Sequence, residues 1–151
     1  GQGVTYATST MGADHTAGYA VATNILDIGG SVDPLKKEGQ VDLSRDLQVA
    51  TAAVDSTGLC VFAAFAILDN DQALPQVVDM LNAQYDIDLE LGDVTALGKS
   101  ILQTEREFNK QAGFTKADDR LPKFFEEEEV PPHNVTFDIT GEELDEVYEL
   151  E

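Results

Sequence analysis

Apolar residues recur at helical spacing along most of this chain, and few stretches alternate as a strand would. Over residues 41–55 one face of a 3.6-residue period carries Leu43, Leu47, Ala50 and Val54. Over residues 93–112 one face carries Val94, Leu97, Ile101, Phe108 and Ala112. A third stretch, residues 74–84, groups Leu74, Val77, Val78 and Leu81 in the same way. These three patterns each predict an amphipathic helix.

Residues that start and stop helices set the expected boundaries. Asp14 is a predicted N-cap for a helix over residues 15–24, and Asp93 for the helix that Gly113 ends. Gly58 is the expected stop after residues 41–55, because glycine tolerates the left-handed conformation. Thr140 and Glu143 have the spacing of a capping box before a last short helix.

The remaining segments are expected to be irregular, apart from one apolar run. Residues 1–12, 28–40 and 116–132 are rich in glycine, proline or charge and predict loops, and residues 135–139 form a short alternating stretch. Residues 60–68 are almost wholly apolar without alternation, which favours a buried helix, with a buried strand as the alternative. The predicted fold is mainly α, an irregular helical domain of five to six helices with little or no strand.

Composition excludes several classes of protein. The chain has 151 residues and 42% hydrophobic content, enough for one globular domain. No run of about 18 apolar residues predicts a membrane span. The formal net charge of −20 disfavours binding to nucleic acid. Residues 112–151 hold 13 acidic and 3 basic residues, which is half of this charge. A uniformly acidic surface also suits a soluble protein that repels its own copies, or one from a salt-adapted organism.

The N-terminal sequence and the single cysteine suggest where the protein acts. No basic segment followed by an apolar stretch marks a signal peptide, and one free thiol is typical of a reducing, cytoplasmic setting. The chain starts without methionine, directly in motif-like sequence. We therefore expect a domain spanning residues 1–151 that is a piece of a larger protein.

Two clusters could carry chemistry. In the first, Met11-Gly12-Ala13-Asp14-His15, a carboxylate and a histidine stand at a predicted helix start, where an anion could bind and His15 could exchange a proton. The plain alternative is that Asp14 only caps and His15 is only its neighbour. The other histidine, His133, and the acidic run 126–129 read as solvated surface.

The second cluster is Asp55-Ser56-Thr57-Gly58-Leu59-Cys60. A carboxylate at a helix C-terminus opposes the helix dipole, so Asp55 suggests a ligand or donor beside it. One cysteine cannot by itself hold zinc or an iron–sulfur cluster, which normally take four protein ligands. Cys60 is therefore either a buried inert residue or one ligand of a site completed by another segment.

Three segments together resemble the tungsten-containing aldehyde ferredoxin oxidoreductase family, in its C-terminal helical part. The first is Gly12-Ala13-Asp14-His15, and the second is the Asp-x-x-Gly-Leu-Cys string ending at Cys60. The third is Glu105-Arg106-Glu107-Phe108-Asn109, followed by Asp119-Arg120-Leu121-Pro122. Each alone is weak, but the three in this order are specific, and they cover nearly all of the chain.

The resemblance implies a role for each matching residue. Cys60 would be the fourth ligand of a [4Fe-4S] cluster. Asp55 would hydrogen-bond the pterin of a tungsten or molybdenum cofactor. Gly58 and Leu59 would let the backbone approach this pterin, and Asp14 would lie beside the same cofactor. His15 would donate or accept a proton while an aldehyde substrate is oxidised, with ferredoxin as the electron acceptor.

The resemblance also implies what must lie elsewhere. The family's other three cluster cysteines and its first pterin motif belong to upstream domains. This piece alone is therefore expected to be inactive and to hold neither cofactor, and its exposed faces could pair with copies of itself as a homodimer. Two other readings stay open: a non-enzymatic acidic helical interaction module, and a family member that reduces acids or acyl thioesters.

Overall fold

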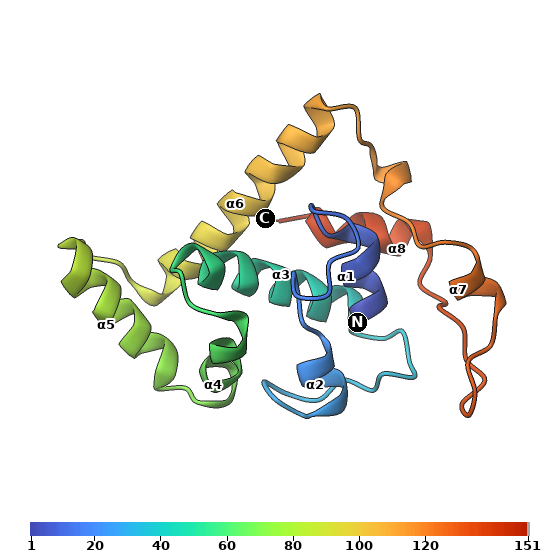
Figure 1. The fold of residues 1–151 in the computed structure, drawn as a ribbon, viewed down its shortest axis with the longest axis horizontal. Coiled ribbons are helices and arrows are strands. Elements are labelled where there is room, and N and C mark those ends of the chain that lie inside the picture. The colour runs from blue at the N-terminus through green and yellow to red at the C-terminus, as the bar shows by residue number, and fades with distance from the viewer. Residues whose placement is uncertain (151) are drawn as a thin grey trace.

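The computed structural model describes residues 1–150 and is built from helices joined by long irregular segments (Figure 1). Val130 and Val135 form an isolated bridge, and the described residues contain no strand beyond it. The mainly α prediction is therefore confirmed. In chain order the elements are α1 (Gln2–Thr8), α2 (Val21–Ile25), α3 (Gln40–Ser56), η1 (Val61–Ala63), α4 (Ala64–Asp69), α5 (Ala73–Tyr85), α6 (Leu91–Gln111), η2 (Lys116–Asp118), α7 (Phe124–Glu127), α8 (Gly141–Asp145) and η3 (Glu146–Tyr148).

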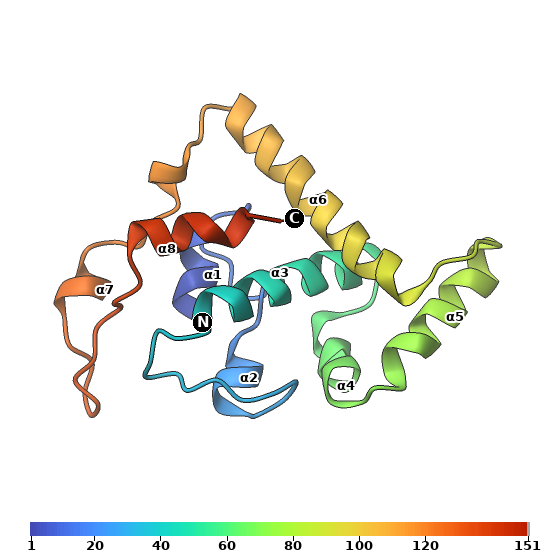
Figure 2. The ribbon, with the colours of Figure 1, turned by 180° about the vertical axis from the view of Figure 1, so that it is seen from behind.

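Helix α3 is the central element of the fold. It contacts α6, α1, η1 and η3, while α4 and α5 lie toward one end of the molecule and α7 toward the other (Figures 1 and 2). Gly98 of α6 is buried against α3, and a Cβ built on it would overlap the carbonyl oxygen of Val49. The absence of a side chain at Gly98 thus permits this close helix crossing.

The apolar core joins the two ends of the chain. Helix α1 packs against the C-terminal segments through a cluster of buried residues, namely Val4, Ala7, Leu121, Ile139, Leu144 and Val147. Tyr6 and Tyr148 are partly buried against this cluster. The first eight residues are therefore part of the core, and the predicted loop over residues 1–12 is wrong for residues 2–8.

A buried polar network lies between α1 and α3. The Gln48 amide donates to the Thr8 hydroxyl at 3.0 Å and the Ser44 hydroxyl at 3.1 Å. The Tyr148 hydroxyl donates to the Thr8 carbonyl at 2.6 Å, and it lies 3.0 Å from the Gln48 side-chain oxygen. The short helix α1 is therefore held by buried packing and these bonds, which local sequence patterns do not reveal.

Four predicted helices are confirmed, with small differences at their ends. They are α3, α5, α6 and the last one, α8, whose Thr140–Glu143 capping box is present. Glu90, not Asp93, is the N-cap of α6, and the Asp93 carboxylate accepts the Glu90 N–H at 2.7 Å. Gly58 and Gly113 follow α3 and α6 with φ of +79° and +99°, as expected of helix stops.

Two other expectations fail. The helix predicted over residues 15–24 is absent up to Ala20, and only α2 is helical. The run from Cys60 to Leu68 is helical as η1 and α4, but none of its residues is buried. Its apolar pattern predicted the helix correctly but not its exposure, because within residues 1–150 no element covers its outer face.

Within residues 1–150, no single helix has both the length and the apolar character of a membrane span. Helix α3 and the η1–α4 segment together reach that length and apolar character, but they are bent by 118° relative to each other.

Candidate functional site

The loop between α1 and α2 is shaped by Asp14. Its Oδ1 accepts hydrogen bonds from the Thr16 N–H at 2.6 Å, the Thr16 hydroxyl at 2.8 Å and the Ala17 N–H at 2.8 Å. Partial burial opposes ionisation of Asp14, but these bonds and nearby His15 outweigh it and lower the pKa of the carboxyl. Asp14 therefore caps a tight turn, where the sequence had predicted the start of a helix.

His15 is exposed on this loop, with its ring and backbone both held. Its Nδ1 lies 2.7 Å from the Tyr6 hydroxyl, and its carbonyl accepts the Gln2 side-chain N–H at 3.0 Å. The rings of His15 and Tyr19 pack edge to face, with their centres 4.9 Å apart. Sequence reasoning missed Tyr6 and Gln2 because a helix over residues 2–8 was not expected, and it missed Tyr19 because this residue belongs to none of the motif segments.

Asp55 lies in the last turn of α3 and faces the same loop. Burial raises the pKa of its carboxyl, and the negative charge of Asp14 raises it further. Asp14 of the first motif segment and Asp55 of the second are thus close enough for their carboxylates to repel each other. No hydrogen-bond donor to Asp55 from residues 1–150 offsets this repulsion, so the carboxylate is available to an outside donor.

A hollow of about 260 Å³ lies between the loop that carries Asp14 and His15 and the second and third motif segments. Thr10 and Met11 line it from the loop, Asp55 and Ser56 from α3, and Glu105 from α6. The Thr10 hydroxyl donates to Glu105 at 2.6 Å, and Asn109 donates to the Thr10 carbonyl at 2.8 Å. The Glu-Arg-x-Phe-Asn segment therefore acts here by holding the loop that carries Asp14 and His15.

The rest of the third segment is also structural. Arg106 makes two hydrogen bonds to Asp119, at 2.9 and 2.5 Å, and its guanidinium lies 4.4 Å above the centre of the Tyr148 ring. Leu121 is buried in the core. These contacts tie α6 to the segment that follows it and to the end of the chain.

Cys60 is an exposed free thiol at the turn after α3. The thiol is therefore not buried by residues 1–150. Just before it, Gly58 is exposed, and a Cβ at that position would meet no atom within 4 Å. Tyr19 contacts Phe65 and Phe62, at ring-centre distances of 5.4 and 6.2 Å, so aromatic rings connect the His15 loop to the segment that follows Cys60.

No group of three or more His, Cys, Asp or Glu side chains within residues 1–150 is arranged to hold a metal ion. One exposed thiolate ligand fits the edge of a cluster whose other ligands come from a different segment. The Asp55 carboxylate and the uncovered backbone at Gly58 likewise fit contact with a polar group that lies beside such a cluster and is held by a different segment.

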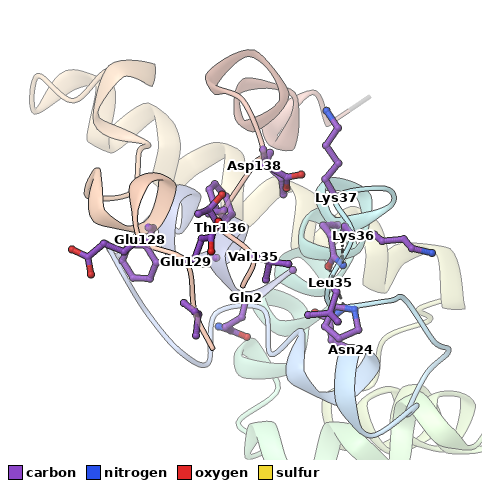
Figure 3. A pocket seen from close by; sticks show the side chains of 18 of the residues that line it. Gln2, Asn24, Leu35, Lys36, Lys37, Glu128, Glu129, Val135, Thr136 and Asp138 are labelled. Carbon is purple, nitrogen blue, oxygen red and sulfur yellow. Dashed lines mark hydrogen bonds between the residues drawn. The ribbon is translucent and has the colours of Figure 1, made fainter. Parts of the chain in front are cut away.

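A larger hollow, of about 590 Å³, lies elsewhere, between α1, α2 and the segment that contains α7 (Figure 3). Gln2 and Asn24 line it, with Leu35 and Lys37 from the loop before α3 and Thr136 from the far side. No residue of the three motif segments lines it. It is therefore separate from the predicted site.

The structure thus brings an exposed thiol, two neighbouring carboxylates and a held histidine together on an α-helical frame. The family model described as "Aldehyde ferredoxin oxidoreductase, domains 2 & 3" matches residues 1–151. The chain therefore belongs to the aldehyde ferredoxin oxidoreductase family, as its three motif segments predicted.

Relatives named "Tungsten-containing aldehyde ferredoxin oxidoreductase" support this assignment. The chain is 35% identical over 133 residues to the protein of Pyrococcus furiosus and 36% identical over 136 residues to that of Pyrococcus horikoshii. It is 35% identical over 133 residues to that of Thermococcus kodakarensis. Each match covers 87% of this chain but only 21% of the relative, so the chain spans about a fifth of the length of these proteins.

Proposed function

We propose that this chain is the part of an aldehyde-oxidising enzyme that completes a cofactor site begun by other domains of the same protein. Cys60 supplies one ligand of a [4Fe-4S] cluster, and Asp55, Gly58 and Leu59 face the pterin of a tungsten or molybdenum cofactor. The observation that carries this proposal is the exposure of Cys60 beside the open backbone at Gly58, within a family of tungsten enzymes.

The chemistry of the reaction assigns a role to His15. Oxidation of an aldehyde with water to a carboxylic acid releases two electrons and two protons. When bound, the metal cofactor would take up the electrons, which the cluster would pass to ferredoxin. His15 is exposed and held by Tyr6 and Tyr19, so it is placed to move a proton at its free Nε2. Asp14 shapes the loop that carries it.

The exposed apolar side chains after Cys60 support an interface with another domain. Phe62 is 61% exposed, and Cys60 stands next to it. An apolar segment in which residues 1–150 bury no side chain is typical of a face that meets another polypeptide. We assign this face to the other domains of the enzyme.

Substitution of Cys60 by serine in the full-length enzyme tests the ligand assignment. Iron and sulfide content should fall and the absorption and electron paramagnetic resonance of the cluster should be lost or altered, because serine is a poor ligand for iron in this setting. Ser100→Ala is the control, since Ser100 is exposed on α6 and lies outside the three motif segments. Unchanged iron content with an unchanged spectrum in Cys60→Ser would refute the assignment.

Substitution of His15 by alanine tests the proton role. Turnover should fall by about 10²- to 10⁴-fold, the usual contribution of a positioned acid or base, with tungsten and iron content retained. His133→Ala, at the exposed second histidine, should leave turnover unchanged. Normal turnover in His15→Ala would remove His15 from the chemistry.

A further inference from the structure

The Tyr6 hydroxyl is held at a fixed place by the core. Tyr6 is on α1 and packs against the buried cluster around Val4 and Val147. The bond to His15 Nδ1, at 2.7 Å, is the hydrogen bond that this hydroxyl makes to residues 1–150. A tyrosine fixed by its ring presents its O–H at a set position at little cost in side-chain entropy. Tyr6 thus offers His15 a preorganised partner.

His15 is restrained from two further directions. Gln2, on the same helix as Tyr6, donates to the His15 carbonyl, and Tyr19 packs edge to face on the His15 ring. The charged group nearest in sequence, Asp14, has its Oδ1 committed to Thr16 and Ala17. The side-chain hydrogen bond at the imidazole itself is therefore the one from Tyr6.

We infer that Tyr6 is a positioning residue that donates its hydroxyl proton to His15 Nδ1 and so holds the neutral imidazole with its proton on Nε2. The hydrogen bond at one imidazole nitrogen decides which tautomer is present, because a nitrogen that accepts cannot carry the proton. This inference rests on the proposed function for its catalytic meaning, but the tautomer is a property of this chain alone.

Nitrogen NMR of the 151-residue chain, labelled with ¹⁵N-histidine and kept at a pH where imidazole is neutral, tests the tautomer. We expect His15 to show the pattern of a single Nε2–H tautomer, while His133 shows the averaged pattern of an exposed imidazole. Tyr6→Phe should turn the His15 pattern into an average and leave His133 unchanged. Tyr85→Phe, at an exposed tyrosine on α5, should change neither.

Two NMR results would overturn the inference: an averaged or Nδ1–H pattern for His15 in the wild type, or a pattern that Tyr6→Phe leaves unchanged. The wild-type spectrum decides the matter even where the variant does not fold.

The catalytic meaning is tested in the tungsten-loaded full-length enzyme. Tyr6→Phe should lower kcat severalfold, with KM and the tungsten and iron contents unchanged, because the imidazole loses both its single tautomer and its fixed orientation. An unchanged kcat in Tyr6→Phe, where His15→Ala is impaired, would overturn the positioning role. Full turnover in His15→Ala would instead refute the proposed proton role of His15, and the NMR result would stand separately.

Discussion

Gly98 of α6 lies directly against the backbone of Val49 on α3, so that a Cβ at position 98 would overlap the Val49 carbonyl oxygen and come within 2.9 Å of its carbonyl carbon. Neither group is the flexible end of a side chain. The close crossing of α3 and α6, the two longest helices, therefore depends on the lack of a side chain at position 98. The same crossing places Glu105 and Asn109 where they can hydrogen-bond to Thr10.

Gly98→Ala should thus destabilise the fold, although alanine is the better helix former. Forcing atoms into a packed interface costs about 1–3 kcal/mol, more than the gain of about 1 kcal/mol from helix propensity. Urea unfolding followed by circular dichroism measures the difference. Gly92→Ala is the matched control in the same helix, with nothing within 4 Å of its Cβ, and should be neutral or slightly stabilising. Equal stability of the two variants would contradict the close crossing.

Arg106→Lys should cost about 1–3 kcal/mol of stability, although the charge is kept. Lysine cannot reproduce the two parallel bonds to Asp119, nor the flat stacking on the Tyr148 ring. Lys110→Gln, which removes an exposed ion pair with Glu107, should change stability by less than about 0.5 kcal/mol. Thermal unfolding of both variants measures this, and an unaltered melting temperature in Arg106→Lys would show that charge alone is needed.

Asp14→Ala should destabilise the loop in a pH-dependent way. The folded pKa of Asp14 lies below its ordinary value of 3.8, so its ionised form stabilises the fold above that value. The loss caused by Asp14→Ala should be about 1 kcal/mol at pH 7, as for a lost helix cap, and should shrink as pH falls through 3.8 and below. Unfolding measured from pH 7 to pH 3 tests this, and a loss that stays constant would exclude the carboxylate as its cause.

Asp55→Asn should have the opposite effect on the stability of the fold at neutral pH. Burial and Asp14 raise the folded pKa of Asp55 above 3.8, so its ionised form opposes folding at neutral pH. We expect Asp55→Asn to raise stability slightly at pH 7, by less than about 1 kcal/mol because the side chain is exposed. The gain should disappear at a pH below 3.8, where both states of the wild type are protonated. A gain that persists there would point to a cause other than charge.

Asn109→Ala should loosen the loop that carries His15 while leaving α6 helical. It removes the bond to the Thr10 carbonyl, and alanine has the higher helix propensity. Amide hydrogen exchange around Met11 and His15 should become faster without much change in overall stability. Gln111→Ala, two positions along α6 at an exposed site, is the control. Unchanged exchange in the loop would mean that Asn109 does not hold it.

The sequence predicted the long helices and the three motif segments because both depend on local patterns. Helix α1 was missed because seven residues are too few to form a helix without tertiary contacts, and its contacts lie far along the chain, in α3 and in residues such as Tyr148 and Val147. The helix expected after Asp14 failed because the same capping oxygen that starts a helix can also close a turn.

The site was foreseen in part. The exposure of Cys60 agrees with the ligand hypothesis, but the apolar run after it was expected to be buried in this chain. Periodicity identifies an apolar helix but not the surface that covers it. Likewise, the third motif segment was recognised as a signature, and only the structure shows that Glu105 and Asn109 hold the Thr10 loop.

The bonds from Tyr148 to the Thr8 carbonyl and to Gln48 have a consequence for biosynthesis. Thr8 leaves the ribosome 140 residues before Tyr148 does, so the start of this domain must wait for nearly all of it to be translated before its last hydrogen bonds can close. Until then the carbonyl at Thr8 would be bound to water, and the histidine loop beside it would be exposed to proteases and chaperones.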